Sequence, residues 1–186
     1  MLRIQLPYVF SLVIIGLISR LIPHPPNCTA MHAIALLAPC MTGGLFAAVL
    51  CVYLTMICSD WLIGSHASLF FVYSSYAVSI CIGRWLARRP GFSRYALASL
   101  LSVGIFYLLT NFGEWLISPL YAKSTAGLLS SYVAALPFVG RELLFALLYG
   151  ALIFTTDSLV CRGRAKGWGS KVRQKLLAEK RQQSGG

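Results

Sequence analysis

Long apolar stretches alternate with short polar or proline-containing segments over most of the chain. A helix that crosses a bilayer needs about 20 mostly apolar residues. Six stretches are candidates for such helices, although the second is short: Pro7–Ile22, Thr29–Cys40, Gly43–Ile63, Ser68–Ala87, Tyr95–Ile117 and Phe138–Val160. The pattern predicts an all-α membrane protein, built as a bundle of six transmembrane helices.

The boundary between the second and third stretches has two interpretations, because no charged residue lies between Ala33 and Cys58. The two stretches could form one long helix. Against this, Pro39 and the triplet Thr42-Gly43-Gly44 form a cluster that breaks helices. We therefore expect two helices joined by a tight turn.

The segment between Ser118 and Pro137 is too polar in its first half to cross a membrane. We expect a surface loop that ends in a short re-entrant or interfacial helix at residues 127–136. Non-helical backbone at membrane depth must be covered by protein or water. Such a loop would therefore pack over the bundle.

Composition supports the membrane assignment, since 58% of the residues are hydrophobic and 11% are charged. Soluble domains are typically about 25% charged. Residues 162–186 differ, with eight Lys/Arg and one Glu. We expect a six-helix transmembrane domain at residues 1–161 and a basic cytoplasmic tail at 162–186. Trp168, Val172 and Leu176 recur every four residues there, which fits either an amphipathic helix on the anionic inner leaflet or a solvated tail.

The positions of Lys and Arg predict the orientation, because cytoplasmic loops are enriched in these residues. With six spans, 13 of them fall on one side of the membrane and 3 on the other, the latter being Arg20, Lys123 and Arg141. This places both termini in the cytoplasm, in the inner membrane of a bacterium. With five spans, only the N-terminus and the loop at residues 20–27 would change sides. The rule accounts for the positive charge, so we expect the lipid bilayer and no nucleic acid as a partner.

Small residues recur at intervals of four in two places. Such rows allow helix backbones to approach closely in lipid. They indicate either docking to a partner membrane subunit or packing within this bundle. The rows are Gly43 with Ala47, Gly44 with Ala48, and Ser75 with Ser79 and Gly83.

Polar, ionisable and aromatic residues gather at the ends of the spans that this topology places outside. Such groups are costly at membrane depth and mark functional sites by default. The candidate substrate-binding residues are Arg20, His24, Asn27, Asp60, His66, Tyr73, Asn111, Glu114, Trp115 and Arg141. Trp61 and Tyr76 could form further aromatic walls. The alternative is that these residues are interfacial anchors and helix caps, with Arg20 and Arg141 as structural ion-pair partners of Asp60 and Glu114.

Other chemistry has little support in the sequence. His24, Cys28 and His32 recur every four residues, as metal ligands on one helix face do, but Pro25 and Pro26 interrupt that helix. We therefore predict no metal site. The sequence contains no Gly-x-Ser-x-Gly, His-Glu-x-x-His or phosphate-loop motif. We expect a protein that is not an enzyme and has no cofactor.

Several segments resemble a family of small, uncharacterised bacterial membrane proteins that look similar to the substrate-capture (S) subunits of energy-coupling factor transporters. They lie between Arg20 and Phe138: Arg20-Leu-Ile-Pro-His-Pro-Pro-Asn27, Ser59-Asp60-Trp-Leu-Ile-Gly64, Phe71-Val-Tyr73, Thr110-Asn111-Phe-Gly-Glu-Trp115 and Pro137-Phe138. The resemblance implies an S-component-like bundle of six helices that binds a vitamin or similar metabolite near its outer face. It also implies docking to a transmembrane coupling subunit driven by ATPases. The first stretch lacks the Ala-x-x-x-Ala docking motif common in S subunits.

Two hypotheses follow for the function. The first is a substrate-binding subunit for uptake of a small organic metabolite, whose energy comes from a separate partner. The second is a structural or assembly membrane protein, whose polar residues form an intramembrane ion-pair network.

Overall fold

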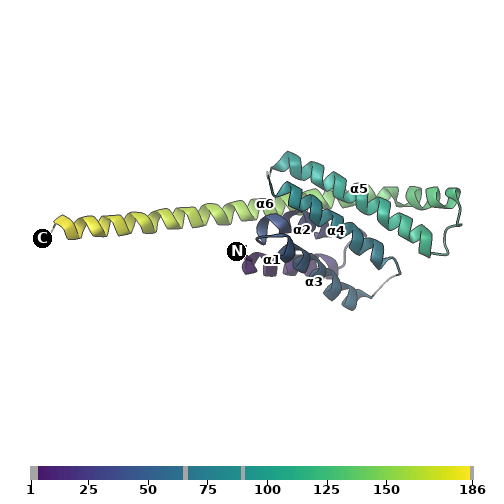
Figure 1. Ribbon diagram of the computed structural model, residues 1–186, viewed down its shortest axis with the longest axis horizontal. Coiled ribbons are helices and arrows are strands. Elements are labelled where there is room, and N and C mark those ends of the chain that lie inside the picture. The colour runs from purple at the N-terminus through teal and green to yellow at the C-terminus, as the bar shows by residue number, and fades with distance from the viewer. Residues whose placement is uncertain (1–3, 65–66, 89–90, 185–186) are drawn as a thin grey trace. The chain divides into compact units, whose positions relative to one another are not determined.

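The computed structural model describes residues 4–64, 67–88 and 91–184, with side chains as far as Thr155. This part of the chain contains six helices and no strand (Figure 1). The helices are α1 (Leu6–Leu21), α2 (Met31–Met41), α3 (Leu45–Ile63), α4 (Leu69–Leu86), α5 (Phe92–Ile117) and α6 (Thr125–Ser184). The all-α class predicted from the sequence is confirmed.

The chain divides into two compact units, Met1–Gly150 and Ala151–Gly186. The first contains α1 to α5 and the first part of α6. The second is helical through Ser184, so the tail has the helical backbone that one of the two sequence interpretations expected. The side chains of Trp168, Val172 and Leu176 lie outside the described part, so their contact with lipid remains a prediction.

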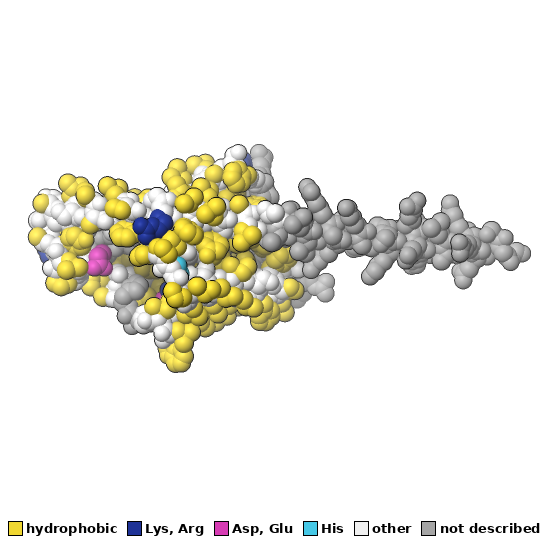
Figure 2. Space-filling view, turned by 180° about the vertical axis from the view of Figure 1, so that it is seen from behind, with side chains coloured by type: hydrophobic (Ala, Val, Ile, Leu, Met, Phe, Trp, Pro, Cys, Tyr) yellow, Lys and Arg dark blue, Asp and Glu magenta, His cyan; other side chains and the backbone are white. Residues whose placement is uncertain are grey.

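Four helical segments in the described residues are long and apolar enough to cross a membrane, which is consistent with a membrane protein. They are Leu45–Ile63, Leu69–Leu86, Phe92–Ile117 and Thr125–Thr155. Large apolar side chains are exposed along them, for example Phe46 and Phe70, which are 74% and 72% exposed. On the face shown in Figure 2, hydrophobic side chains predominate and charged ones are few.

The remaining two helices are shorter, so the prediction of six full-length spans is not confirmed. At about 1.5 Å per residue, the 16 residues of α1 extend about 24 Å and the 11 residues of α2 about 16 Å. The hydrocarbon core of a bilayer is about 30 Å thick. Helix α2 is too short to cross it alone.

Helix α2 forms the centre of the first unit. Every residue from Met31 to Pro39 is buried, and the helix packs against α1, α3, α4 and α5. A helix that is apolar on all sides is expected to be buried in this way. It ends at Met41, and Gly43 and Gly44 then adopt φ of 91° and 154°, which favours glycine. The predicted pair of helices joined by a tight turn is confirmed, and the single long helix is wrong.

Small residues on α4 allow it to approach α2 closely. A Cβ atom on Gly83 would lie 2.5 Å from the carbonyl oxygen of Leu36. Ser79 and Ser75, one and two turns earlier, are fully buried. This row therefore serves packing within the chain. The rows Gly43 with Ala47 and Gly44 with Ala48 also serve packing within the chain. Ala47 and Ala48 are buried, and the two glycines lie in the turn before α3.

The segment before Pro137 differs from the prediction. Helix α6 begins at Thr125 and continues through Pro137, so the expected separate short helix and the expected start of the last span at Phe138 are wrong. A proline inside a helix removes one backbone hydrogen bond, and membrane helices tolerate this where their neighbours compensate. Ser124 marks the true start, since its Oγ accepts a 3.2 Å hydrogen bond from the N–H of Gly127.

We expect the variant Gly83→Ala to lower the free energy of unfolding by about 1–3 kcal/mol, because the added methyl group would clash with backbone atoms of α2. Gly104→Ala in α5 is the matched control, since a Cβ there meets nothing within 4 Å. Denaturant unfolding of the detergent-purified proteins measures both. Equal stability of the two variants would contradict the close packing of α2 and α4.

Candidate functional site

A cavity of about 470 Å³ lies among the helices of the first unit. It is lined by polar and aromatic side chains from α1, the α1–α2 connection, α4, α5 and α6, together with Ile63 at the end of α3. The lining residues are Arg20, His24, Asn27, Thr29, Ile63, Ser68, Val72, Tyr76, Phe106, Thr110, Glu114 and Glu142. A second cavity of about 330 Å³ shares four of them, namely Asn27, Phe106, Thr110 and Glu142. Polar residues from distant sequence segments therefore line common cavities.

The α1–α2 connection holds its polar residues in place through local hydrogen bonds. The backbone N–H of Ala30 donates a 3.1 Å hydrogen bond to Oγ of Ser19, whose own hydroxyl donates to the carbonyl oxygen of Gly16. Asn27 adopts a φ of 64°, a left-handed conformation that asparagine tolerates better than most residues. This turn places Asn27 in the walls of both cavities.

A first polar network joins α1, α3 and α4. Nη2 of Arg20 donates to Oδ1 of Asp60, and the hydroxyl of Tyr73 donates a 2.8 Å hydrogen bond to Oδ2 of the same carboxylate. Asp60 is 8% exposed, so both of its oxygens are satisfied inside the protein. The predicted pairing of Arg20 with Asp60 is confirmed. The 470 Å³ cavity is lined by Arg20 but not by Asp60 or Tyr73.

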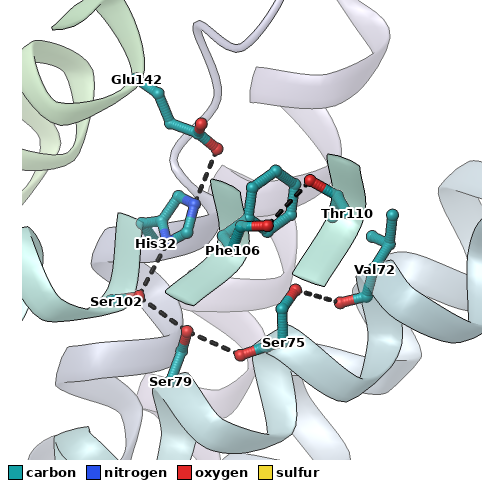
Figure 3. Close-up of polar contacts among 8 residues, drawn as sticks. All are labelled: His32, Val72, Ser75, Ser79, Ser102, Phe106, Thr110 and Glu142. Atoms are coloured by element: carbon teal, nitrogen blue, oxygen red, sulfur yellow. Dashed lines mark hydrogen bonds and ion pairs between the residues drawn. The ribbon is translucent and has the colours of Figure 1, made fainter. Parts of the chain in front are cut away.

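A second polar network surrounds His32, near the start of α2 (Figure 3). Its Nε2 lies 2.8 Å from Oε1 of Glu142 on α6, and its Nδ1 lies 2.8 Å from Oγ of Ser102 on α5. Ser102 in turn contacts Oγ of Ser79 on α4 at 2.7 Å. The hydroxyl of Ser79 donates a 2.9 Å hydrogen bond to the carbonyl oxygen of Ser75. Four helices are thus joined by one chain of contacts.

Five of the ten predicted site residues line the two cavities. Arg20, His24, Asn27 and Glu114 line the larger one, and Asn111 lines the smaller one. His24 is exposed, with Nδ1 2.7 Å from the carbonyl oxygen of Pro25.

The other five predicted residues lie elsewhere. Asp60 and Tyr73 belong to the first network, and His66 lies outside the described residues. Trp115 stacks against Phe112 and donates a 2.9 Å hydrogen bond from Nε1 to the carbonyl oxygen of Ala122, so it fixes the loop before α6.

Arg141, which the sequence offered beside Arg20 as a candidate partner of Asp60 and Glu114, forms an ion pair with neither. Its guanidinium lies 5.8 Å from the ring centroid of Phe138. Among the described residues, the ion pairs are Arg20 with Asp60 and His32 with Glu142. Glu114 therefore borders the cavity without a cationic partner in this part of the chain.

Sequence reasoning missed the central role of His32, which it considered only as a metal ligand. The described residues contain no group of three or more potential metal ligands, and Cys28 contacts the carbonyl oxygen of Pro26 instead. The useful signal is the position of His32 in an otherwise apolar stretch, where an ionisable side chain is costly without a partner. Ser79 and Ser102 carry no such signal, because single serines are common in membrane helices.

In the residues that the structure describes, these features define an all-helical protein with four helices long and apolar enough to cross a membrane and a polar cavity among its helices. Residues 2–167 match the family of unknown function DUF6580, and the chain belongs to this family. No curated protein and no solved structure matches the chain.

We expect Asp60→Asn to lower the free energy of unfolding by about 2–3 kcal/mol, because it leaves the largely buried guanidinium of Arg20 without a counter-charge. Tyr73→Phe, which removes one hydrogen bond to the same carboxylate, should cost about 1 kcal/mol. Denaturant unfolding in detergent provides both values. A larger loss for Tyr73→Phe than for Asp60→Asn would contradict the central role of the ion pair in this network.

Proposed function

We propose that this protein is a substrate-binding membrane protein that captures a small organic metabolite or vitamin in the 470 Å³ cavity. The main support for this proposal is that polar side chains from four helices and from the α1–α2 connection line one cavity of that size. Small-molecule sites in proteins typically enclose about 300–1,000 Å³ and combine apolar walls with a few placed polar groups.

The chemistry of the cavity wall suits a ligand with a flat apolar part and a polar or charged end. The rings of Tyr76 and Phe106 lie 5.4 Å apart and provide the apolar surface. Glu114 contributes a carboxylate without an ion-pair partner among the described residues. Arg20 contributes the positive charge of its guanidinium to the wall, although its Nε is buried. The carboxylate of Glu114 remains available to orient a ligand.

In this proposal the protein resides in the inner membrane of a bacterium, with both termini in the cytoplasm and the α1–α2 connection outside. The Lys and Arg distribution supports this orientation. The resemblance to S subunits suggests that a transmembrane coupling subunit with ATPases supplies the energy. Transport then requires a rocking movement of the bundle relative to that partner.

A structural or assembly role is the second candidate. The network of Arg20, Asp60 and Tyr73 favours it, because Asp60 is satisfied internally and does not line the cavity. This role requires the polar network for stability but no ligand in the cavity. Ligand-dependent stabilisation separates the two candidates.

The test is a thermal-shift screen of the detergent-purified protein against vitamins and related metabolites. A true ligand at a hundredfold excess over its Kd stabilises the folded state by about 2.7 kcal/mol. The stabilisation should fall in Glu114→Gln and persist in Arg94→Gln, since Arg94 packs against Trp85 and lines neither cavity. Stabilisation by no compound in a broad screen would favour the structural role.

The orientation has its own test, in a variant whose six native cysteines are replaced by serine. A cysteine introduced at His24, which is exposed, should react with a membrane-impermeant maleimide added to intact spheroplasts. A cysteine at Arg88, after α4, should react only after permeabilisation. The reverse labelling pattern would contradict the proposed orientation.

A further inference from the structure

The contacts around His32 require a particular number of protons. Four close contacts run from Glu142 through His32, Ser102 and Ser79 to the carbonyl oxygen of Ser75, with lengths of 2.8, 2.8, 2.7 and 2.9 Å (Figure 3). Each is short enough to need one hydrogen between its two heavy atoms. With a neutral imidazole and an ionised Glu142, this series of contacts has only three such hydrogens. They are the hydroxyl hydrogens of Ser79 and Ser102 and one hydrogen on the imidazole ring.

The direction of each hydrogen bond in this series follows from its last acceptor, the carbonyl oxygen of Ser75. A carbonyl oxygen can only accept, so the hydroxyl of Ser79 donates to Ser75. Ser102 must then donate to Ser79, and Nδ1 of His32 must donate to Ser102. This leaves Nε2 and the carboxylate oxygen 2.8 Å apart with no hydrogen between them unless the pair carries an additional proton.

Both members of the pair are buried. His32 is 2% exposed and Glu142 is 6% exposed. The rings of Tyr76 from α4 and Phe106 from α5 lie 5.2 and 5.1 Å from the imidazole. The contact nevertheless borders open space, because Glu142 lines both cavities.

Other charged or titratable groups of the described residues line the same two cavities as Glu142. The larger cavity has Arg20 from α1, His24 from the α1–α2 connection, Tyr76 from α4 and Glu114 from α5, and the smaller one has Tyr107 from α5 and Tyr121 from the loop before α6. Asp60 from α3 pairs with Arg20.

We propose that His32 and Glu142 together form a proton-binding site that holds one exchangeable proton between Nε2 and Oε1. The occupied site is neutral overall, either as imidazolium and carboxylate or as imidazole and carboxylic acid. Release of the proton leaves one negative charge in the wall of both cavities and breaks one of the four contacts. Protonation of this pair therefore sets the charge that the cavities present. The inference does not depend on the identity of a ligand or on transport.

The test uses the full-length protein with 15N-labelled histidine, in detergent micelles, studied by NMR between about pH 5 and pH 9. The three histidines are told apart with single variants of His24 and His66. We expect Nδ1 of His32 to carry a hydrogen throughout, while the Nε2 signal changes as the shared proton is released.

Glu142→Gln is the informative variant, because the amide N–H of glutamine can donate to Nε2 of a neutral imidazole. All four contacts then have a hydrogen without the additional proton. In this variant His32 should stay neutral with its hydrogen on Nδ1, and its signals should not change over the same pH range. Arg94→Gln, which alters a charged residue that packs against Trp85 and lines neither cavity, should behave as the wild type does.

Three results would overturn the proposal. One is a wild-type His32 that is neutral with its hydrogen on Nε2 across the range. Another is a wild-type Nε2 signal that does not change with pH. The third is a pH response in Glu142→Gln equal to that of the wild type.

Discussion

The pairing of His32 with Glu142 is the interaction on which the arrangement of the site depends. Polar groups cannot be left unpaired in an apolar interior without a cost of about 1–3 kcal/mol each, and more for charged groups. His32 lies on a helix that is buried on every side, so its ring nitrogens have no access to bulk solvent. The partners come from α5 and α6, so His32 links α2 to both helices. The cavities lie beside this contact and share Glu142 as a wall.

The two polar networks have different consequences for function. In the network of Arg20, Asp60 and Tyr73, the carboxylate has both oxygens bound and does not line the larger cavity. This carboxylate is satisfied without a ligand. The His32 network is complete only with an additional proton, and Glu114 borders the cavity without an ionic partner in the described part of the chain. A proton can therefore complete the His32–Glu142 contact, and a ligand can pair with Glu114.

Much of the fold follows from the sequence, because apolar length and helix breakers are local properties. They predicted helices near the positions of α1 to α5 and the break between α2 and α3. The prediction that a helix ends before Pro137 was wrong, because the effect of a proline on a helix depends on neighbouring helices that a local pattern does not reveal. Charge complementarity gave the pairing of Arg20 with Asp60. The partners of His32 lie 70 and 110 residues away in the sequence, and no local pattern indicates that residues so far apart are in contact.

The most direct measurement is a double-mutant cycle that combines His32→Leu with Glu142→Met and follows the free energy of unfolding in detergent. Each single substitution leaves a buried polar partner unsatisfied, whereas the double substitution removes both partners. We predict that the double variant is destabilised less than the sum of the single variants, by about 1–3 kcal/mol. Additive effects within about 0.5 kcal/mol would show that the two side chains do not interact, and would contradict the account.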